Sequence, residues 1–217
     1  GIELGVLKRM AAASSLPLSE FLVDSFSKVG AKTAAEICLY SKLKPETKAD
    51  TLSLEQLSAL LEAMQTTKIP APPASQCLSP ITEELIVKGM EKEFELDFIK
   101  ARTRPGNVFG GHSFIVEAAI GYGGKLQTEG QATLLRFANR VPLLYQQGAC
   151  AITNAVQGVN WKNYNVSQQG LPTGPLMILV HVAATNVPFT SESKDAVASV
   201  PEVEREITLA LQELGRD

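Results

Sequence analysis

The sequence predicts an α+β protein, in which a small all-helical domain precedes a four-stranded sheet with packed helices. Three observations predict it. Up to residue 70, apolar side chains recur at the three- and four-residue spacing of amphipathic helices. From residue 76 onward, four segments instead have the alternating or continuous apolar pattern of strands. Between them lies the proline-rich stretch 71–75, which cannot continue a helix and favours an extended connector.

The composition is that of an ordinary globular protein. Of 217 residues, 45% are hydrophobic and 20% are charged, and the net charge is −3, so any contact with nucleic acid must be local. The cysteines and histidines are too far apart for a zinc site, and we expect neither a metal site nor a disulfide framework. No apolar run approaches the roughly 20 residues that cross a bilayer. Because the chain opens on Gly1 and stops within a helix-like run, we expect a piece of a longer protein.

Residues 1–70 are expected to form the helical domain. Ser19 is placed to cap a first helix, which Gly30 breaks. Further helices are expected over 34–39 and from Ser53 onward, where leucines recur at helical spacing. Helices joined by a short glycine-containing turn resemble the helix–hairpin and helix–two-turn–helix modules that sit on nucleic-acid backbones. A plain helical domain explains the same pattern.

Residues 76–217 are expected to form the sheet domain. Ser79 and Pro80 supply an N-cap and a first-turn proline for a helix ahead of the sheet. The apolar pattern then predicts strands over 97–104, 113–121, 132–138 and 176–184. A helix over 152–159 is expected before the last strand, and another over 203–214 after it. The order β-β-β-α-β-α implies helices packed on a four-stranded sheet.

The loop after the last strand, residues 186–198, is the strongest candidate for binding an anion. It carries several hydroxyl side chains and Lys194, and a helix is expected to begin directly after it. Free N–H groups and the helix dipole favour an anion there, and a lysine adds a point charge, so a phosphate ligand fits. The alternative is that Ser191 or Ser193 caps the helix and that Lys194 is an ordinary solvated side chain.

The first predicted strand carries a row of cations. Side chains alternate between the two faces of a strand, so Lys100, Arg102 and Arg104 are expected to share one face. Three cations in a row suit the backbone of DNA. The alternative is a solvated edge that discourages strand-to-strand aggregation.

A second candidate for DNA contact is the run Trp161-Lys162-Asn163-Tyr164, which combines two aromatic rings with one cation. Lysine can contact a phosphate while the rings of Trp161 and Tyr164 pack on sugar or base. The alternative is that Trp161 anchors the loop to the sheet and leaves Lys162 and Tyr164 at the surface.

Five short motifs, in the same order, resemble the B subunits of topoisomerase VI. The run Pro188–Ala196 is similar to the loop that carries the switch lysine in the transducer domain of that family, and 161–164 is similar to its Trp-Lys-x-Tyr motif. The other three are Cys77–Ile81, Phe114–Glu117 with Tyr122–Gly124, and Arg136–Leu144. The resemblance covers 76–217 nearly end to end, and 14–41 resembles the family's helix–two-turn–helix insert.

The resemblance implies a transducer similar in fold to the second domain of a ribosomal small-subunit protein, working beside an ATPase domain of the GHKL type. Lys194 is then both the catalytic and the nucleotide-binding residue, reaching the terminal phosphate of an ATP (as Mg-ATP) that is held mainly by a domain without a match in these residues. We therefore expect this chain alone to be inactive. The implied partners are a second B subunit, the DNA-cleaving A subunit and double-stranded DNA. An archaeal cytoplasm is the expected location, or the nucleus in a plant.

Two other functions remain open from the residues. A non-enzymatic nucleic-acid-binding module would explain the helical hairpin and the basic strand, but not Lys194 in its hydroxyl-rich loop. The transducer of a mismatch-repair type of GHKL ATPase would leave the helical domain of residues 1–70 unexplained.

Overall fold

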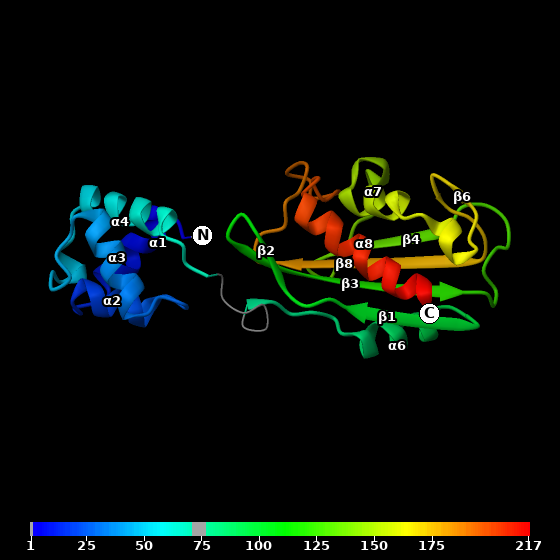
Figure 1. The fold of residues 1–217 in the computed structure, drawn as a ribbon, viewed down its shortest axis with the longest axis horizontal. Coiled ribbons are helices and arrows are strands. Elements are labelled where there is room, and N and C mark those ends of the chain that lie inside the picture. Colours follow the sequence, from blue (N-terminus) through cyan, green and yellow to red (C-terminus); the bar gives the residue numbers. More distant parts are fainter. Residues whose placement is uncertain (1, 71–76) are drawn as a thin grey trace. The chain divides into compact units, whose positions relative to one another are not determined.

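The computed structural model describes residues 2–70 and 77–217, and the chain forms two compact units, residues 1–72 and 73–217 (Figure 1). The proline-rich linker predicted over 71–75 lies outside the described residues. Each unit has its own hydrophobic core. No helix in the described ranges is long and apolar enough to cross a bilayer.

The first unit is all-helical, as the sequence predicts. Its elements are α1 (Leu4–Ala12), α2 (Leu18–Ser25), α3 (Ala31–Ser41), a 3-10 turn (Ala49–Thr51) and α4 (Leu54–Thr66). The start of α4 is confirmed, because Ser53 and Gln56 exchange hydrogen bonds between the side chain of each and the N–H of the other. Gly30 is the residue before α3, which confirms the predicted break.

The predicted cap at Ser19 is wrong, because α2 begins one residue earlier, after Pro17. The N–H groups at this helix start find acceptors elsewhere in the fold. Leu18 N–H donates to the carbonyl of Thr47 at 2.8 Å, and Ser19 N–H donates to the carbonyl of Pro45 at 3.0 Å. A serine cap is therefore unnecessary, and burial of Leu18 in the core sets where the helix begins.

The second unit is a mixed sheet with helices, so the predicted α+β class is confirmed. All four predicted strands are present, as β1 (Phe98–Thr103), β3 (His112–Tyr122), β4 (Thr133–Ala138) and β8 (Leu176–Ala184). Two short strands that the sequence analysis did not predict, β2 (Asn107–Phe109) and β5 (Val141–Pro142), extend the sheet to six strands. A separate two-stranded pair joins β6 (Gln168–Gln169) to β7 (Leu171–Pro172).

The strand order is β1-β3-β8-β4-β5, with β2 also paired to β3. Of these neighbours only β4 and β8 run parallel. A parallel pair needs a crossover connection. The helix predicted between them supplies it, as α7 (Ala151–Gly158). The central strand β8 is buried along its whole length, as its apolar sequence predicts.

Helices cover both faces of the sheet (Figure 1). α7 and α8 (Pro201–Arg216) pack on one face, whose core includes Phe114 and Val180. The other face packs Ala119 and Leu179 against α6 (Glu83–Glu93). This alternation along β3 and β8 is the two-residue period of a strand buried on both sides.

The predicted N-cap at Ser79 and Pro80 is also wrong, since α6 begins only at Glu83. The reason is a buried carboxylate on the sheet. Glu117, on β3, accepts hydrogen bonds from the N–H groups of Ile81 and Thr82, both at 2.8 Å. These bonds hold 81–82 in a non-helical path, in which Thr82 has a φ of 86°, and they displace the helix start.

Glu117 is the centre of a buried polar network within an otherwise apolar sheet. It also accepts from the hydroxyl of Thr103 on β1 (2.8 Å) and from Nδ1 of His181 on β8 (2.7 Å). Nε2 of His181 in turn accepts from the N–H of Arg140 at 3.0 Å, which assigns the Nδ1–H tautomer to the histidine. Burial alone would raise the pKa of Glu117, but the hydrogen bonds from His181, Ile81, Thr103 and Thr82 together hold that pKa below its ordinary value.

We predict that Glu117→Gln lowers the unfolding free energy of the second unit by about 2–3 kcal/mol, because an amide nitrogen would face N–H donors that lose their acceptor. Trp161 is the only tryptophan and is buried in this unit, so its fluorescence during urea unfolding reports on it. Glu129→Gln, at a solvent-exposed carboxylate, is the matched control and should change little.

The same carboxylate sets a pH dependence. Because its folded pKa lies below its unfolded one, its stabilisation is complete above the unfolded pKa and is lost as pH falls through the folded pKa. Below about pH 4.3, where an unfolded glutamate is more than half protonated, the unaltered chain should lose stability more steeply than Glu117→Gln. Equal slopes for the two proteins would contradict this account.

Candidate functional site

The loop that carries Lys194 leaves the end of β8 and returns toward α8. Its two sides are joined by a bridge between Phe189 and Val197 and by a hydrogen bond from Thr190 N–H to the carbonyl of Ala196 (3.0 Å). At its tip, Lys194 adopts a left-handed conformation with a φ of 57°, which is uncommon for a residue with a side chain. The N–H of Lys194 donates to the carbonyl of Ser191. The tip is thus a defined turn.

The side chain of Lys194 is exposed. Within residues 2–70 and 77–217, its ammonium meets no carboxylate. The hydroxyl groups of Ser191 and Ser193 lie beside it in the sequence and share a hydrogen bond of 2.7 Å. Glu192 and Asp195 also lie in this loop, but among the described residues neither forms an ion pair with Lys194. An ammonium without an ion pair, with neighbouring hydroxyl donors, suits a phosphate.

The helix expected after the loop 186–198 is α8, which starts at Pro201, whose ring fixes the backbone for a first helical turn. Its start is not at Lys194 itself, because the returning side of the loop lies between them. Between them, Ala196 and Val197 are buried and form the returning side of the loop. Neither Ser191 nor Ser193 therefore caps α8, and no helix dipole acts at the tip, so any anion there depends on the lysine and the loop itself.

The base of this loop is fixed to the start of α7. The N–H of Val197 donates to Sγ of Cys150 at 3.4 Å, and the N–H of Ala151 donates to the carbonyl of Val197 at 2.8 Å. Cys150, Ala151 and Val197 are all fully buried. The loop therefore has a rigid base in the core and an exposed tip.

The Trp-Lys-Asn-Tyr run forms a short 3-10 helix, Trp161–Tyr164. Trp161 is only 1% exposed, and its Nε1 donates to the carbonyl of Val156 at 2.8 Å. Its ring is therefore not available for stacking on a base, which agrees with the anchoring alternative. Tyr164 is half-buried and meets Trp161 edge to face, and Lys162 is exposed. Of the three side chains, Lys162 is the one left free to contact a phosphate.

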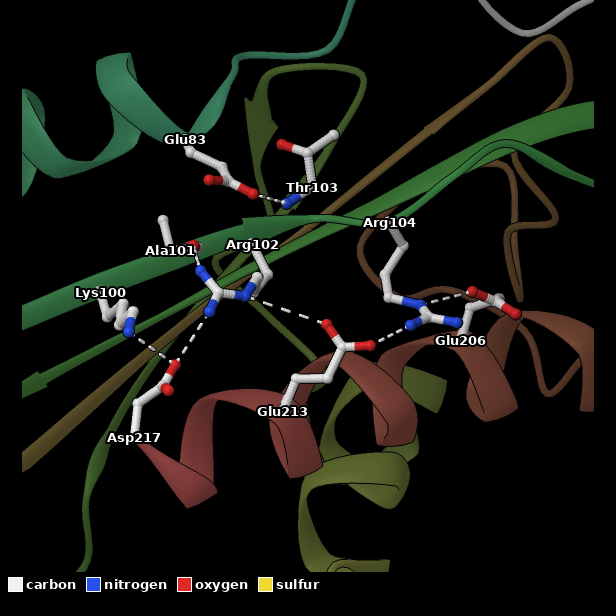
Figure 2. A network of polar contacts seen from close by, with 9 residues as sticks. All are labelled: Glu83, Lys100, Ala101, Arg102, Thr103, Arg104, Glu206, Glu213 and Asp217. Carbon is white, nitrogen blue, oxygen red and sulfur yellow. Dashed lines mark hydrogen bonds and ion pairs between the residues drawn. The ribbon is translucent and has the colours of Figure 1, made fainter.

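One face of β1 carries Lys100 and Arg102, Arg104 follows directly after the strand, and all three side chains are turned toward α8 (Figure 2). Lys100 and Arg102 both reach the carboxylate of Asp217, each at 3.0 Å. Arg104 donates to Glu206 at 2.9 Å and also pairs with Glu213, which lies 4.0 Å from Arg102. The hydrogen bond from Lys100 lowers the pKa of Asp217, and the charges of Lys100 and Arg102 act in the same direction.

Within the described residues, the structure adds ion pairs to this basic row, which lies at the edge strand β1. The three cations form an ion-pair ladder with three carboxylates of α8 and its end, so their charges are balanced within the unit. The two-residue period of a strand predicted that the three cations share one face, but it did not predict that α8 covers this face. A DNA phosphate would have to displace these carboxylates, and the row therefore supplies little positive potential to a ligand.

The buried network of Glu117, His181 and Arg140 was not predicted from the sequence. One signal was present: each of two apolar strands has one buried ionisable residue in its middle, and these two, Glu117 and His181, are register partners. A lone buried charge requires a partner. In the described residues, no three acidic, histidine or cysteine side chains gather where they could hold a metal ion.

Comparison with known proteins gives the family. The family model described as "Topoisomerase VI B subunit, transducer" matches residues 73–217. The B subunit of type 2 DNA topoisomerase 6 from Methanococcoides burtonii is 53% identical over 219 residues, covering 100% of this chain and 35% of that protein. The B subunits of the same enzyme from Methanosarcina barkeri and Archaeoglobus fulgidus are 49% and 44% identical, again over 100% of this chain.

The chain thus spans 35–36% of the length of these relatives. The similarity includes the helical unit as well as the sheet unit, because the alignments cover the whole chain. A mismatch-repair transducer, which would leave residues 1–70 unexplained, does not fit this coverage. The chain belongs to the family of topoisomerase VI B subunits, and residues 73–217 are its transducer domain.

Proposed function

We propose that this chain couples the binding and hydrolysis of ATP to the passage of double-stranded DNA and to the relaxation of supercoils, as part of a topoisomerase VI B subunit. Lys194 is the residue that contacts the terminal phosphate of the nucleotide. The observation that carries the proposal is its exposed ammonium, uncompensated among the described residues, at the tip of a loop with a buried base. Membership of the family supports the same role.

The donors at the loop tip fit a phosphate. Phosphate oxygens accept hydrogen bonds from an ammonium and from hydroxyl groups, and the side chain of Lys194 is exposed and so accessible to another domain. ATP, when bound, supplies the terminal phosphate whose hydrolysis releases free energy. A contact made before hydrolysis and lost after it is a two-state switch. Most of the nucleotide site, with its magnesium, belongs to a domain outside these residues, so this chain alone should be inactive.

The base of the loop connects the proposed phosphate contact at Lys194 to α7 and β8. A force on Lys194 acts on Val197, which is bonded to Cys150 and Ala151 at the start of α7. The loop also continues directly from β8, the central strand of the sheet. A phosphate contact at the tip therefore pulls on the sheet and on the helix that crosses it, and the transducer shifts as one body.

The proposed partners follow from the same assignment. A second B subunit associates when ATP binds, and an A subunit cleaves the DNA. Contact with DNA on this chain rests on Lys162, with Tyr164 beside it, because Trp161 is buried and the cations of β1 are paired. A purely nucleic-acid-binding module is less well supported, since its basic strand is neutralised by α8.

Lys194→Ala should slow ATP hydrolysis by the reconstituted A and B subunits about ten- to a hundredfold. A hydrogen bond to a charged group contributes about 1.5–3 kcal/mol, and each 1.4 kcal/mol corresponds to about tenfold in rate. Stability should be unchanged, because the side chain is exposed. The measurement is steady-state ATPase activity together with supercoil relaxation.

Two further variants sharpen this test. Lys194→Arg should restore only part of the activity, since a planar guanidinium cannot take the compact position of an ammonium. Lys125→Ala removes another exposed lysine of the same unit and should have no effect. Full hydrolysis with alanine at position 194 would reduce Lys194 to an ordinary surface lysine.

The two candidate DNA contacts predict different salt dependence. Binding of duplex DNA, followed by fluorescence anisotropy, should be weak and insensitive to sequence. Lys162→Ala should reduce the log–log salt slope by about 0.9, the value for one lost phosphate contact. Lys100→Gln removes a lysine that is ion-paired, leaves Asp217 paired with Arg102, and should leave the slope unchanged. A slope that falls for Lys100→Gln and not for Lys162→Ala would reverse the assignment.

A further inference from the structure

Next to the Lys194 loop, the structure holds three large apolar side chains in solvent. Val141, Leu144 and Tyr145 are 61%, 72% and 67% exposed. They lie on β5 and on the loop that follows it, and we call them the apolar knob. The knob opens a stretch without a charged residue, 141–150, in a chain that is 20% charged. Three large apolar side chains exposed within five residues are a candidate interaction surface.

A buried arginine fixes the knob in place. Arg136, on β4, is 3% exposed, and its Nη2 donates to the carbonyls of Leu143 (3.1 Å) and Tyr145 (2.8 Å). These carbonyls flank Leu144. The N–H of Leu143 also donates to the carbonyl of Arg136 at 2.8 Å. Leu143 faces the core, so Leu144 is held outward. A loop fixed before binding loses less conformational entropy when a partner docks.

The knob and the Lys194 loop are joined by a short path. The chain runs from Tyr145 to Cys150, whose Sγ accepts from the N–H of Val197 at the base of the Lys194 loop. Asn139, in the turn before Val141, exchanges hydrogen bonds with the N–H and the carbonyl of Ala184 at the end of β8. Both features therefore lie at the same end of the sheet, where β4 and β8 finish.

The chemistry of the knob restricts its partner. A neutral, apolar surface does not suit DNA phosphates. The edge strand β5 is two residues long and includes Pro142, which lacks an N–H, so a further strand gains little by pairing there. A side-chain contact with an apolar protein surface remains. The relatives extend well beyond this chain, which covers 35% of the Methanococcoides burtonii protein.

We infer that the apolar knob docks against the nucleotide-binding domain of the same B subunit and so positions the Lys194 loop at the nucleotide. This inference rests on the proposed function, because a domain that presents a phosphate to Lys194 must sit at this end of the sheet. The apolar contact of the knob with that domain forms with or without bound ATP. The contact of Lys194 forms only when the nucleotide carries its terminal phosphate.

Thiol labelling tests the inference directly. Tyr145→Cys is placed in a Cys77→Ser background, in which the remaining cysteines, Cys38 and Cys150, are buried. Its reaction with a maleimide is followed by the mass of the peptide that contains residue 145. In the intact B subunit, without ATP or the A subunit, labelling should be at least about tenfold slower than in this 217-residue chain, since only the undocked fraction reacts.

The chain offers a matched control in Tyr40, which follows Leu39 as Tyr145 follows Leu144. The side chains of Tyr40 and Leu39 are 62% and 74% exposed on α3 of the other unit. Tyr40→Cys should react equally fast in both proteins. In the Tyr145→Cys subunit, a second change, Leu144→Asp, should restore the rate of the 217-residue chain, because a carboxylate resists transfer into an apolar contact. Leu144→Cys provides a second labelling position with the same expected protection.

Each other occupant gives its own result, and each overturns the inference. Equal labelling in the intact subunit and the 217-residue chain means that no domain of the subunit covers the knob. Protection that appears only with the A subunit assigns the surface to that partner. Protection that appears only with a non-hydrolysable ATP analogue and grows with protein concentration assigns it to a second B subunit.

The outcome is separable from that of the proposed function. Docking through the knob does not require the Lys194 ammonium, so Lys194→Ala should leave the labelling rates unchanged. If Lys194→Ala retains full ATPase activity while Tyr145→Cys is protected, the phosphate assignment fails and the docking surface stands. If Lys194→Ala is impaired while Tyr145→Cys labels fast, the reverse holds.

Discussion

The buried carboxylate of Glu117 is the constraint on which the second unit depends. It sits on β3 within an apolar sheet, where an ionised group is stable only if hydrogen bonds replace its hydration. Four donors do so, from Thr103 on β1, His181 on β8, and the backbone of 81–82 ahead of α6. Each of these elements is fixed relative to the others because each must keep its donor on the same two oxygens.

The network also extends to the end of the sheet that carries the candidate site. His181 also accepts a hydrogen bond from the backbone N–H of Arg140, which fixes the position of that residue. The Arg140 guanidinium in turn donates to the carbonyls of Ser79 and Pro80. The turn at Arg140 leads directly into the apolar knob. The segment that precedes α6 and the turn that precedes the knob are thus held by one set of hydrogen bonds, around a single carboxylate. Movement at one of them is expected to strain the other.

Periodicity was sufficient to predict the elements that bury apolar side chains. The four long strands, α7 and α8 all follow from the spacing of their hydrophobic residues, and the family resemblance agrees with them. The first residues of α2 and α6 were harder to predict, because hydrogen-bond acceptors that are distant in the sequence determine where these helices begin. The N–H of Leu18 is satisfied by Thr47, and the N–H groups of 81–82 are satisfied by Glu117. A local capping rule does not include acceptors that are distant in the sequence.

The same limit applied to the candidate site. The spacing of Lys100, Arg102 and Arg104 predicts a shared face, which the structure contains, but their charges are decided by Glu206, Glu213 and Asp217, more than a hundred residues away in the sequence. Trp161 is aromatic in a motif associated with DNA, yet it is buried by the packing of α7 against the sheet. Lys194 was predicted from local features, namely the hydroxyl side chains of its loop and the family resemblance of the loop sequence, and its role as a phosphate ligand stays a prediction.

The ion-paired cations beside α8 and the unpaired Lys194 indicate how the fold separates the groups that stabilise it from the group proposed to respond to the nucleotide. On β1 and α8, cations and carboxylates balance within the unit, so this face holds its geometry without a ligand. At the Lys194 loop the cation has no ion pair among the described residues, and the loop is anchored by the hydrogen bonds of Val197 to Sγ of Cys150 and to the N–H of Ala151 rather than by charge. An ammonium that is already paired gains little from a phosphate, whereas an unpaired one gains the whole contact. Under the proposed function, only the second arrangement lets the position of the transducer depend on whether the phosphate is present.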